Sequence, residues 1–167
     1  MTINFSDGTT IEGGSDVGKI LQVQSTTKTS TFSTTGSSVD VTGLNVSITP
    51  SSSSHKALVH TQITMSGTDN GYARLLRGST AIAIGDASGS RSRGFAHTGF
   101  VNFIGDTGAI PYNTMHLDSP NTTSSTTYKV QIGVGAGTQF VGRGEADGNN
   151  NQNIRSVCTI TAMEVKA

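Results

Sequence analysis

Four histidines are the side chains of this chain best suited to bind a metal ion or to transfer a proton near neutral pH. They are His55, His60, His97 and His116, and they lie on separate segments of the sequence. None has the i, i+4 spacing that places two imidazoles on one face of a helix, and none has a cysteine as a neighbouring ligand. We therefore predict no metal site and no cofactor. The alternative for His60, which falls in a strand-like segment, is a position on the axis of a trimer, where stacked imidazoles could hold an ion.

Paired carboxylates would indicate a glycosidase, in which one acid protonates the leaving group and the other acts as a base or nucleophile. The candidate pairs are Asp106 with Asp118 and Glu145 with Asp147. The chain has no tryptophan and only 5% aromatic residues, so side chains on which a sugar ring could stack are scarce. We predict that the protein is not an enzyme, and a polysaccharide-degrading activity is the weakest alternative.

Two segments rich in glycine and aspartate, residues 85–89 and 105–108, are similar in composition to phosphate-binding or calcium-binding loops. They lack the Lys-Ser/Thr pair of a P-loop and the regularly spaced carboxylates of a calcium loop. Asp and Gly are common in tight turns, so we interpret both segments as turns.

Five of the six arginines lie in or beside predicted strands or loops at turn edges, where a guanidinium could bind a carboxylate through two parallel hydrogen bonds. In an assembly the arginines could pair with acids of a neighbouring copy; the six are Arg74, Arg77, Arg91, Arg93, Arg143 and Arg155. For Arg91 and Arg93 the simpler interpretation is a solvated loop. The single cysteine, Cys158, lies in the strand-like run VCTITAMEV and is expected to be a small buried residue rather than a nucleophile.

The composition limits the classes of partner. Eleven basic and eleven acidic residues give a formal net charge of +0, so no long-range field attracts nucleic acid, and we predict no nucleic-acid partner. No run approaches the roughly 18 apolar residues of a membrane span, and no Sec-type signal is present, so we expect synthesis in a host cytoplasm without membrane insertion. With only 13% charged residues, the protein should tend to associate with copies of itself.

The elements that position these residues are short strands separated by Gly, Ser, Thr, Asn and Asp. The predicted strands are residues 19–24, 29–34, 39–41, 44–48, 57–65, 72–77, 80–84, 100–104, 110–117, 128–134, 139–141 and 155–166. Gly43 shifts the alternation of its segment, which predicts a β-bulge there. No amphipathic helix is expected. The pattern predicts an all-β, antiparallel, jelly-roll-like sandwich whose closing strand pairs near the first; a β-helix or propeller is less favoured because no repeat of fixed period exists.

Residues 1–17 are predicted to be an N-terminal attachment arm and joint, and residues 18–167 the sandwich body. Asp7-Gly8 between two apolar pieces is a strong hairpin signal, and residues 12–16 are rich in glycine and acids. The candidate attachment residues are Ile3, Phe5, Asp7, Gly8 and Ile11.

Three polar loops, residues 86–94, 118–125 and 144–153, are predicted to be exposed. Loops of small polar residues on a rigid scaffold suit adaptable recognition. The candidate recognition residues in them are Arg91, Arg93, Asn121, Asn149 and Asn150.

Several motifs in register resemble a β-rich structural or tail-fibre-like domain of virion proteins from tailed phages, especially marine and cyanobacterial ones. They are GKILQV at 18–23, TFST at 31–34, VDVTGL at 39–44, SITP at 47–50, YARLLRG at 72–78, residues 82–85, LDSP at 117–120, TYKV at 127–130 and residues 159–165. The resemblance covers about residues 18–166 and implies a β-rich, trimeric module on the particle surface. Long fibres usually have an extended shaft before a terminal knob, whereas here only some 17 residues precede the body.

We therefore predict a phage virion structural protein, a homotrimeric capsid decoration or cement protein that stabilises the head shell. Its partners would be its own copies and the major capsid protein or a tail protein. The arm would bind by strand addition, which needs no special side-chain sequence. The alternative is a tail-fibre or tail-tip knob whose loops contact a host surface glycan or protein.

Overall fold

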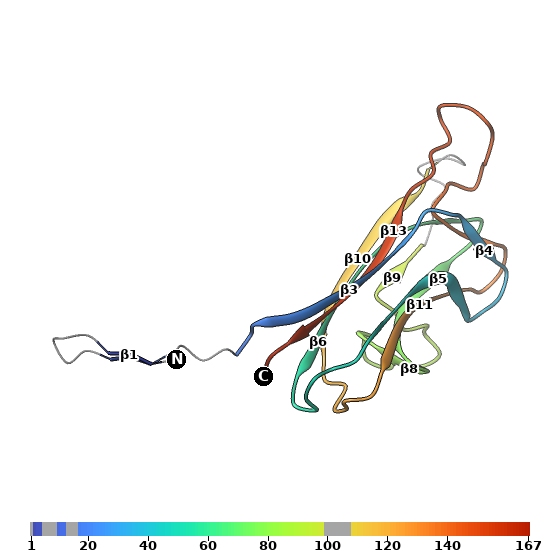
Figure 1. The fold of residues 1–167 in the computed structure, drawn as a ribbon. Coiled ribbons are helices and arrows are strands. Elements are labelled where there is room, and N and C mark those ends of the chain that lie inside the picture. Colours follow the sequence, from blue (N-terminus) through green and yellow to red (C-terminus); the bar gives the residue numbers. More distant parts are fainter. Residues whose placement is uncertain (1, 5–9, 13–16, 99–107) are drawn as a thin grey trace.

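The computed structural model describes residues 2–4, 10–12, 17–98 and 108–167, and all regular elements in these ranges are strands (Figure 1). The strands are β1 (Thr2–Asn4), β2 (Thr10–Glu12), β3 (Ile20–Lys28), β4 (Phe32–Thr34), β5 (Val39–Ile48), β6 (Lys56–Gly67), β7 (Gly71–Arg77), β8 (Thr80–Ile82), β9 (Ala96–His97), β10 (Ile110–Asp118), β11 (Thr126–Val134), β12 (Gln139–Val141) and β13 (Cys158–Val165).

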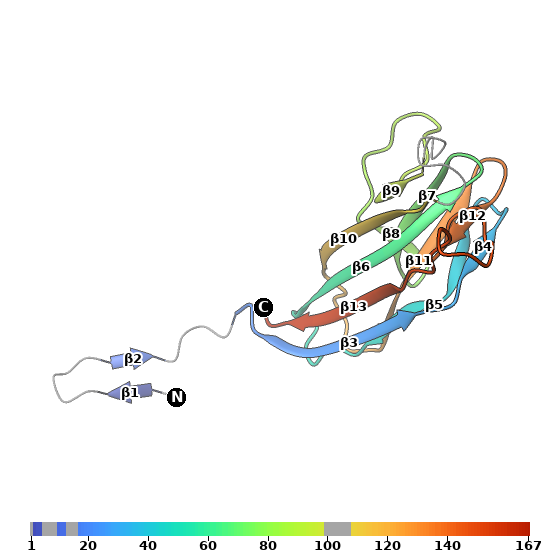
Figure 2. The ribbon, with the colours of Figure 1, turned by 90° about the horizontal axis from the view of Figure 1, so that it is seen from above.

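The body is a sandwich of two antiparallel sheets, each four strands wide. In one sheet, β6 pairs with β10 along one edge, and with β13 and then β12 along its other edge. Next to these, β3 pairs with β13 and β4 pairs with β12. Figure 2 shows β10, β6, β13 and β3 side by side in this layer. The other sheet has β5, β11, β7 and finally β8 and β9, both on the far edge of β7.

The two sheets interleave early and late parts of the chain. Two strands that occupy the same position in a sheet can be counted as one: β3 with β4 is then the first strand, β8 with β9 the fifth and β12 with β13 the eighth. With this numbering the strand order is 1-8-3-6 in the sheet that contains β6 and 2-7-4-5 in the other sheet. Such interleaving of early and late strands in two sheets is typical of a jelly roll. The prediction of an antiparallel all-β sandwich is confirmed, and so is the pairing of the closing strand with the first strand of the body.

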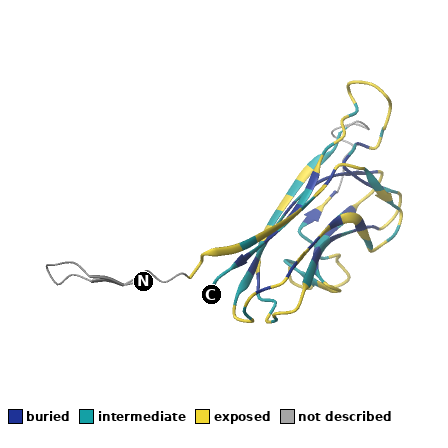
Figure 3. Cartoon of the chain, in the orientation of Figure 1, coloured by how far each residue is buried: buried dark blue, intermediate teal, exposed yellow. Residues whose placement is uncertain are grey.

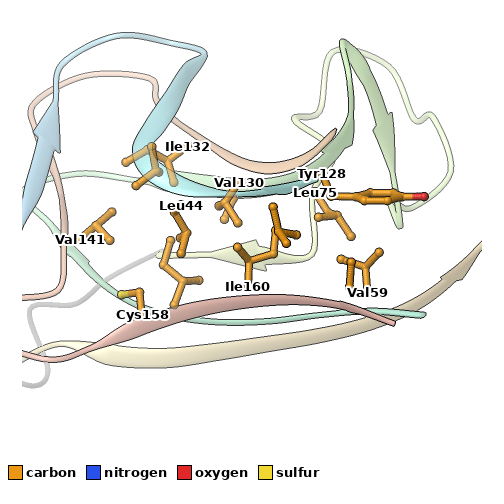
Figure 4. Close-up of a cluster of buried hydrophobic side chains, with 14 of the residues drawn as sticks. Leu44, Val59, Leu75, Tyr128, Val130, Ile132, Val141, Cys158 and Ile160 are labelled. Atoms are coloured by element: carbon orange, nitrogen blue, oxygen red, sulfur yellow. The ribbon is translucent and has the colours of Figure 1, made fainter. Parts of the chain in front are cut away.

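Alternation of apolar and hydroxyl residues places one face of each sheet in the core. In β6 the odd-numbered residues from Ala57 to Ile63 are buried, and in β13 Cys158, Ile160 and Ala162 are buried. The inner faces of both sheets meet in one cluster around Leu44, whose members pack between the layers in Figure 4. Figure 3 shows the same division, with buried residues on the facing sides of the two sheets. The chain thus builds a core from few apolar residues because most of those in the central strands point inward.

The bulge predicted at Gly43 is present. The pairing of β11 with β5 shifts between Lys129 and Gln131, and Gly43 has a φ of +79°, which favours glycine. The buried phase of β5 consequently moves from Val41 to Leu44. The bulge therefore lets one strand keep its apolar residues inward on both sides of the interruption.

Several predicted boundaries are wrong; the predicted strand 19–24, for example, extends to Lys28 in β3, and the predicted strand 155–166 begins only at Cys158. The segment 29–34 is a strand only from Phe32, because β3 pairs with β13 and β4 with β12, and residues 29–31 bridge the gap between those two partners. Asp118 was expected to begin an exposed loop, but it is the buried last residue of β10. The predicted strand at 100–104 lies outside the described residues.

The sandwich has two ends with different turns. The junction end comprises residues 18–19, 49–55, 119–125 and 166, where the Gly18 and Lys166 amides donate to the carbonyls of Lys166 and Lys19 at 2.7 and 2.9 Å. The distal end comprises residues 35–38, 68–70, 135–138 and 142–157, which are joined by backbone hydrogen bonds such as Thr68 N to Thr138 O at 3.0 Å. Strand β6 runs from one end to the other.

Candidate attachment and recognition surfaces

The N-terminal hairpin is a separate small sheet. Strands β1 and β2 pair antiparallel with Ile3 opposite Ile11, and neither pairs with a strand of the body. In Figure 1 the two strands lie to one side of the sandwich, beyond its junction end. Of the candidate attachment residues, Ile3 and Ile11 are thus brought together, whereas Phe5, Asp7 and Gly8 lie outside the described residues.

The junction end is held by a buried carboxylate. Glu164, on β13, is 1% exposed and accepts hydrogen bonds from Gln22 Nε2 at 2.6 Å, Ser51 N at 2.6 Å and Ser51 Oγ at 2.7 Å. His55 Nδ1 lies 2.7 Å from its Oε1 atom. Burial by itself raises the pKa of this carboxyl, but the hydrogen bonds from Gln22, His55 and Ser51 outweigh burial and lower the pKa to about 2. The cluster fastens the 49–55 turn and the start of the body to the last strand.

The alternation of residues in β13 is the sequence signal for this cluster. Glu164 continues the inward alternation of Cys158, Ile160 and Ala162. A carboxylate at an inward position must find donors, because an unpaired buried charge is strongly unfavourable. His55 therefore acts as a structural partner of Glu164 rather than as part of a metal site.

A second buried carboxylate joins the two sheets. Asp118 of β10 accepts from Arg77 Nη1 at 2.9 and 3.0 Å, and from the hydroxyl of Tyr128 at 2.7 Å. Arg77 and Tyr128 belong to the opposite sheet. Burial, and then the hydrogen bond to Asp118, raise the pKa of the Tyr128 hydroxyl. Asp118, a candidate only in the glycosidase alternative, thus forms a structural ion pair with Arg77, and its candidate partner Asp106 lies outside the described residues.

The sequence left open that the arginines pair with acids of a neighbouring copy, but all six make contacts within the chain. Arg77 binds Asp118, and Arg155 binds both oxygens of Asp147 at 3.0 and 2.9 Å. The guanidiniums of Arg74 and Arg143 lie over the rings of Tyr72 and Phe140, 4.3 and 4.0 Å from the ring centroids. Tyr72, Phe140 and Asp147 lie within eight residues of their arginines in the sequence, whereas Asp118 lies 41 residues from Arg77 and is brought to it by the fold.

The segment after β12 forms a hollow at the distal end. It has a volume of about 400 Å³ and is lined by Asp147, Gly148, Asn149, Asn150, Asn153 and Arg155. The amide oxygen of Asn150 accepts from Gln152 N and from Asn153 Nδ2, both at 2.9 Å, so the loop has internal support. A second hollow of about 260 Å³ lies at the same end beside Tyr72, Asn70 and His97. The first presents amide, carboxylate and guanidinium groups, and the second presents amide, hydroxyl and ring groups; both sets can bind a polar ligand.

The candidate recognition residues do not form one surface. Asn149 and Asn150 line the distal hollow, whereas Asn121 lies in the 119–125 turn at the junction end. Arg91 and Arg93 lie in the segment between β8 and β9, where their side chains donate to Ser88 Oγ at 2.9 Å and to the Gly85 carbonyl at 2.6 Å. Ser92, which lies between these two arginines, lines the second distal hollow.

The remaining side chains that could react or bind a metal ion are dispersed over the structure. Cys158 is buried, and burial raises the pKa of its thiol, as expected for a small core residue. Within the described ranges, no group of three or more His, Cys, Asp or Glu side chains could hold a metal ion. No helix long and apolar enough to cross a membrane occurs in the part of the chain that the structure describes.

No protein-family model matches the chain, and no curated protein matches it at a significant level.

Proposed function

We propose that this chain is a structural protein of a phage particle: a homotrimeric decoration or cement protein that binds the head shell through its N-terminal hairpin. The body would form an outward-facing knob, and the bound protein would strengthen the shell. Three arms acting together would bind with avidity, because the second and third arms bind at high effective concentration. The resemblance to virion proteins in several motifs supports the proposal that the chain is part of a phage particle.

The observation that carries the proposal is the isolation of the hairpin. Strands β1 and β2 pair only with each other among the described residues. A two-stranded hairpin alone is marginally stable in water, since it lacks a third strand or a packed face. Its outer edges present unpaired backbone groups, and adding it to the edge of a partner sheet would satisfy them. Attachment is the role that such an element suits best.

The test replaces residues 1–14 with a Gly-Ser segment of the same length and measures occupancy on heads that lack the protein. The replaced protein should fold but fail to sediment with heads, because the strand edges needed for addition are gone. A matched control, Asn149→Ala with Asn150→Ala, should bind heads like the wild type. If the Gly-Ser protein decorates heads at full occupancy, attachment does not use the hairpin.

A second candidate function is a tail-fibre or tail-tip knob that contacts a host glycan. It is supported by the two hollows at the end opposite the hairpin, one of which contains Asn149 and Asn150. Purified protein would then block phage adsorption, and the Asn149→Ala, Asn150→Ala protein would block it much less. Absence of binding to host cells by the purified wild type would remove this candidate.

A further inference from the structure

One outer face of the sandwich is unusually apolar. Cross-strand pairing aligns Leu117 of β10, Leu58 of β6, Met163 of β13 and Val23 of β3 in a single row across the sheet. Leu117 and Val23 are 54% and 53% exposed. Adjacent strand residues alternate sides, so these four side chains point away from the core whose members include Val59 and Ala162. We call the outward positions of these four strands the four-strand face.

The row has apolar neighbours on both sides. Met115, which is 65% exposed, lies opposite His60 in the next row, and Val165 lies opposite Ile20 in the row on the other side. Of the large hydrophobic side chains most exposed in the described body, several belong to this sheet: Ile20, Leu21, Val23, Met115 and Leu117. Contiguous exposed apolar area of this kind marks an interaction surface rather than ordinary solvent-facing sheet.

The opposite sheet provides an internal comparison. Its outer face has Asp40 bound to Lys129 Nζ at 2.5 Å and to Gln131 Nε2 at 3.0 Å. Ser47 Oγ and Thr127 Oγ1 lie 2.7 Å apart on the same face. This is the charged and hydroxylated surface expected of a sheet in water. The two faces of one body thus have different chemistry, and only the four-strand face resembles an interface core.

We infer that the four-strand face is the surface through which copies of this chain associate. An interface between identical copies brings like residues near one another, so like charges there would repel. The outward positions of the paired segments carry a single formal charge, on Lys56 at the margin, where its Nζ donates to Ser119 Oγ at 2.8 Å. A neutral face is compatible with its own copy, whereas it offers no charge by which a different charged partner would select it.

The four-strand face is large enough to form a specific protein–protein interface. Four strands at a spacing of about 4.8 Å, over the nine β6 residues paired with β10 at a rise of about 3.4 Å, cover roughly 600 Å². Two such faces in contact would bury about 1,200 Å² in total, which exceeds the roughly 1,000 Å² expected of a specific interface. The inference deepens the proposed function by assigning the surface through which its copies meet, and it rests on that proposal only for the number of copies. Two faces stacked on each other give a dimer, whereas in a trimer the three faces would meet around a three-fold axis.

The test compares the mass in solution of the full wild-type chain with that of two double variants, by sedimentation equilibrium. Leu117→Lys with Val23→Lys places two charges in the row, on exposed positions of the outer strands. Thr42→Lys with Asn45→Lys places the same charge on exposed positions of the other sheet. The wild type and the second variant should associate. The first should weaken association at least about 100-fold, since like charges in an interface cost several kcal/mol.

Two outcomes would overturn the inference: a wild type that is monomeric, or association that the Leu117 and Val23 lysines leave unchanged. Circular dichroism checks that each variant folds, and the milder pair Met115→Gln and Leu117→Gln replaces the lysines if they prevent folding. A dimer that the lysines dissociate supports the inference and contradicts the proposed trimer. An assembled protein that does not bind heads also supports it and contradicts the decoration function. A monomeric wild type whose lysine variant loses head binding would assign the face to the particle instead.

Discussion

Buried polar side chains decide much of the stability of this sandwich at the scale of single residues. Glu164 and Asp118 each satisfy a carboxylate with several donors from other segments. Thr61 is the opposite case, since its Oγ1 atom is buried and has no hydrogen-bond partner in the described structure. These residues give two predictions of opposite sign.

Substituting Glu164 by Gln should lower the free energy of unfolding by about 2 kcal/mol, because hydrogen bonds to a charged group are lost. The pKa of Glu164 falls from its ordinary 4.5 to about 2 on folding. The carboxylate therefore stabilises the fold fully above pH 4.5, and this contribution disappears as the pH falls from 4.5 to 2. Chemical denaturation at a series of pH values checks this: the wild type should lose stability over that interval more steeply than Glu164→Gln. Equal slopes for the two proteins would contradict the assignment.

Substituting Thr61 by Val should raise the free energy of unfolding by about 1 kcal/mol, because a buried hydroxyl without a partner is replaced by a methyl group of similar size. Denaturant titration measures the change. Thr27→Val, on an exposed position of β3, is the control and should have little effect. A loss of stability in Thr61→Val would mean that the hydroxyl has a partner.

The turn between β6 and β7 shows how one element depends on another. The Gln139 side chain of β12 is fully buried, donates to the Asp69 carbonyl at 2.6 Å and accepts from Thr98 Oγ1 at 2.8 Å. A Cβ atom at Gly71 would lie 2.2 Å from Gln139 Cδ. Glycine is needed here for close approach, because the two hydrogen bonds prevent Gln139 from moving aside.

Gly71→Ala should therefore lower the free energy of unfolding by about 1 to 3 kcal/mol, the usual effect of overpacking. Thermal unfolding measures this as a lower Tm. Gly85→Ala is the matched control, since a Cβ there meets nothing within 4 Å. The double variant Gly71→Ala, Gln139→Ala should remove the steric part of the loss, and strictly additive effects would show that the two positions do not interact.

At the scale of the whole molecule, the hairpin and the sandwich share no strand pairing among the described residues. Replacing residues 1–14 by a Gly-Ser segment should consequently leave the Tm of the body unchanged, because its core cluster lies entirely within the sandwich. Differential scanning calorimetry on the two proteins measures this. A clear fall in Tm would mean that the arm packs on the body.

Much of the body could be predicted from local pattern. Period-two alternation identified β6, β11 and β13 as strands, and Gly78-Ser79 located the two-residue turn between β7 and β8. The surfaces were harder to predict. Asn121 and Asn149 both belong to polar loops, but nothing local distinguishes a loop at the junction end from one at the distal end.

The sequence by itself determined roughly where most strands lie, which of their residues share a side and where β5 bulges, because these depend on neighbours a few residues apart. Only the tertiary structure decided which strands become neighbours. That choice put Ser51 against Glu164, 113 residues away, and Arg77 against Asp118, 41 residues away. It also aligned Leu117, Leu58, Met163 and Val23 in one row, although each occurs on a different strand with no local sign of the others. Contacts of long sequence separation follow from the packing of the sheets, and so do the surfaces they form.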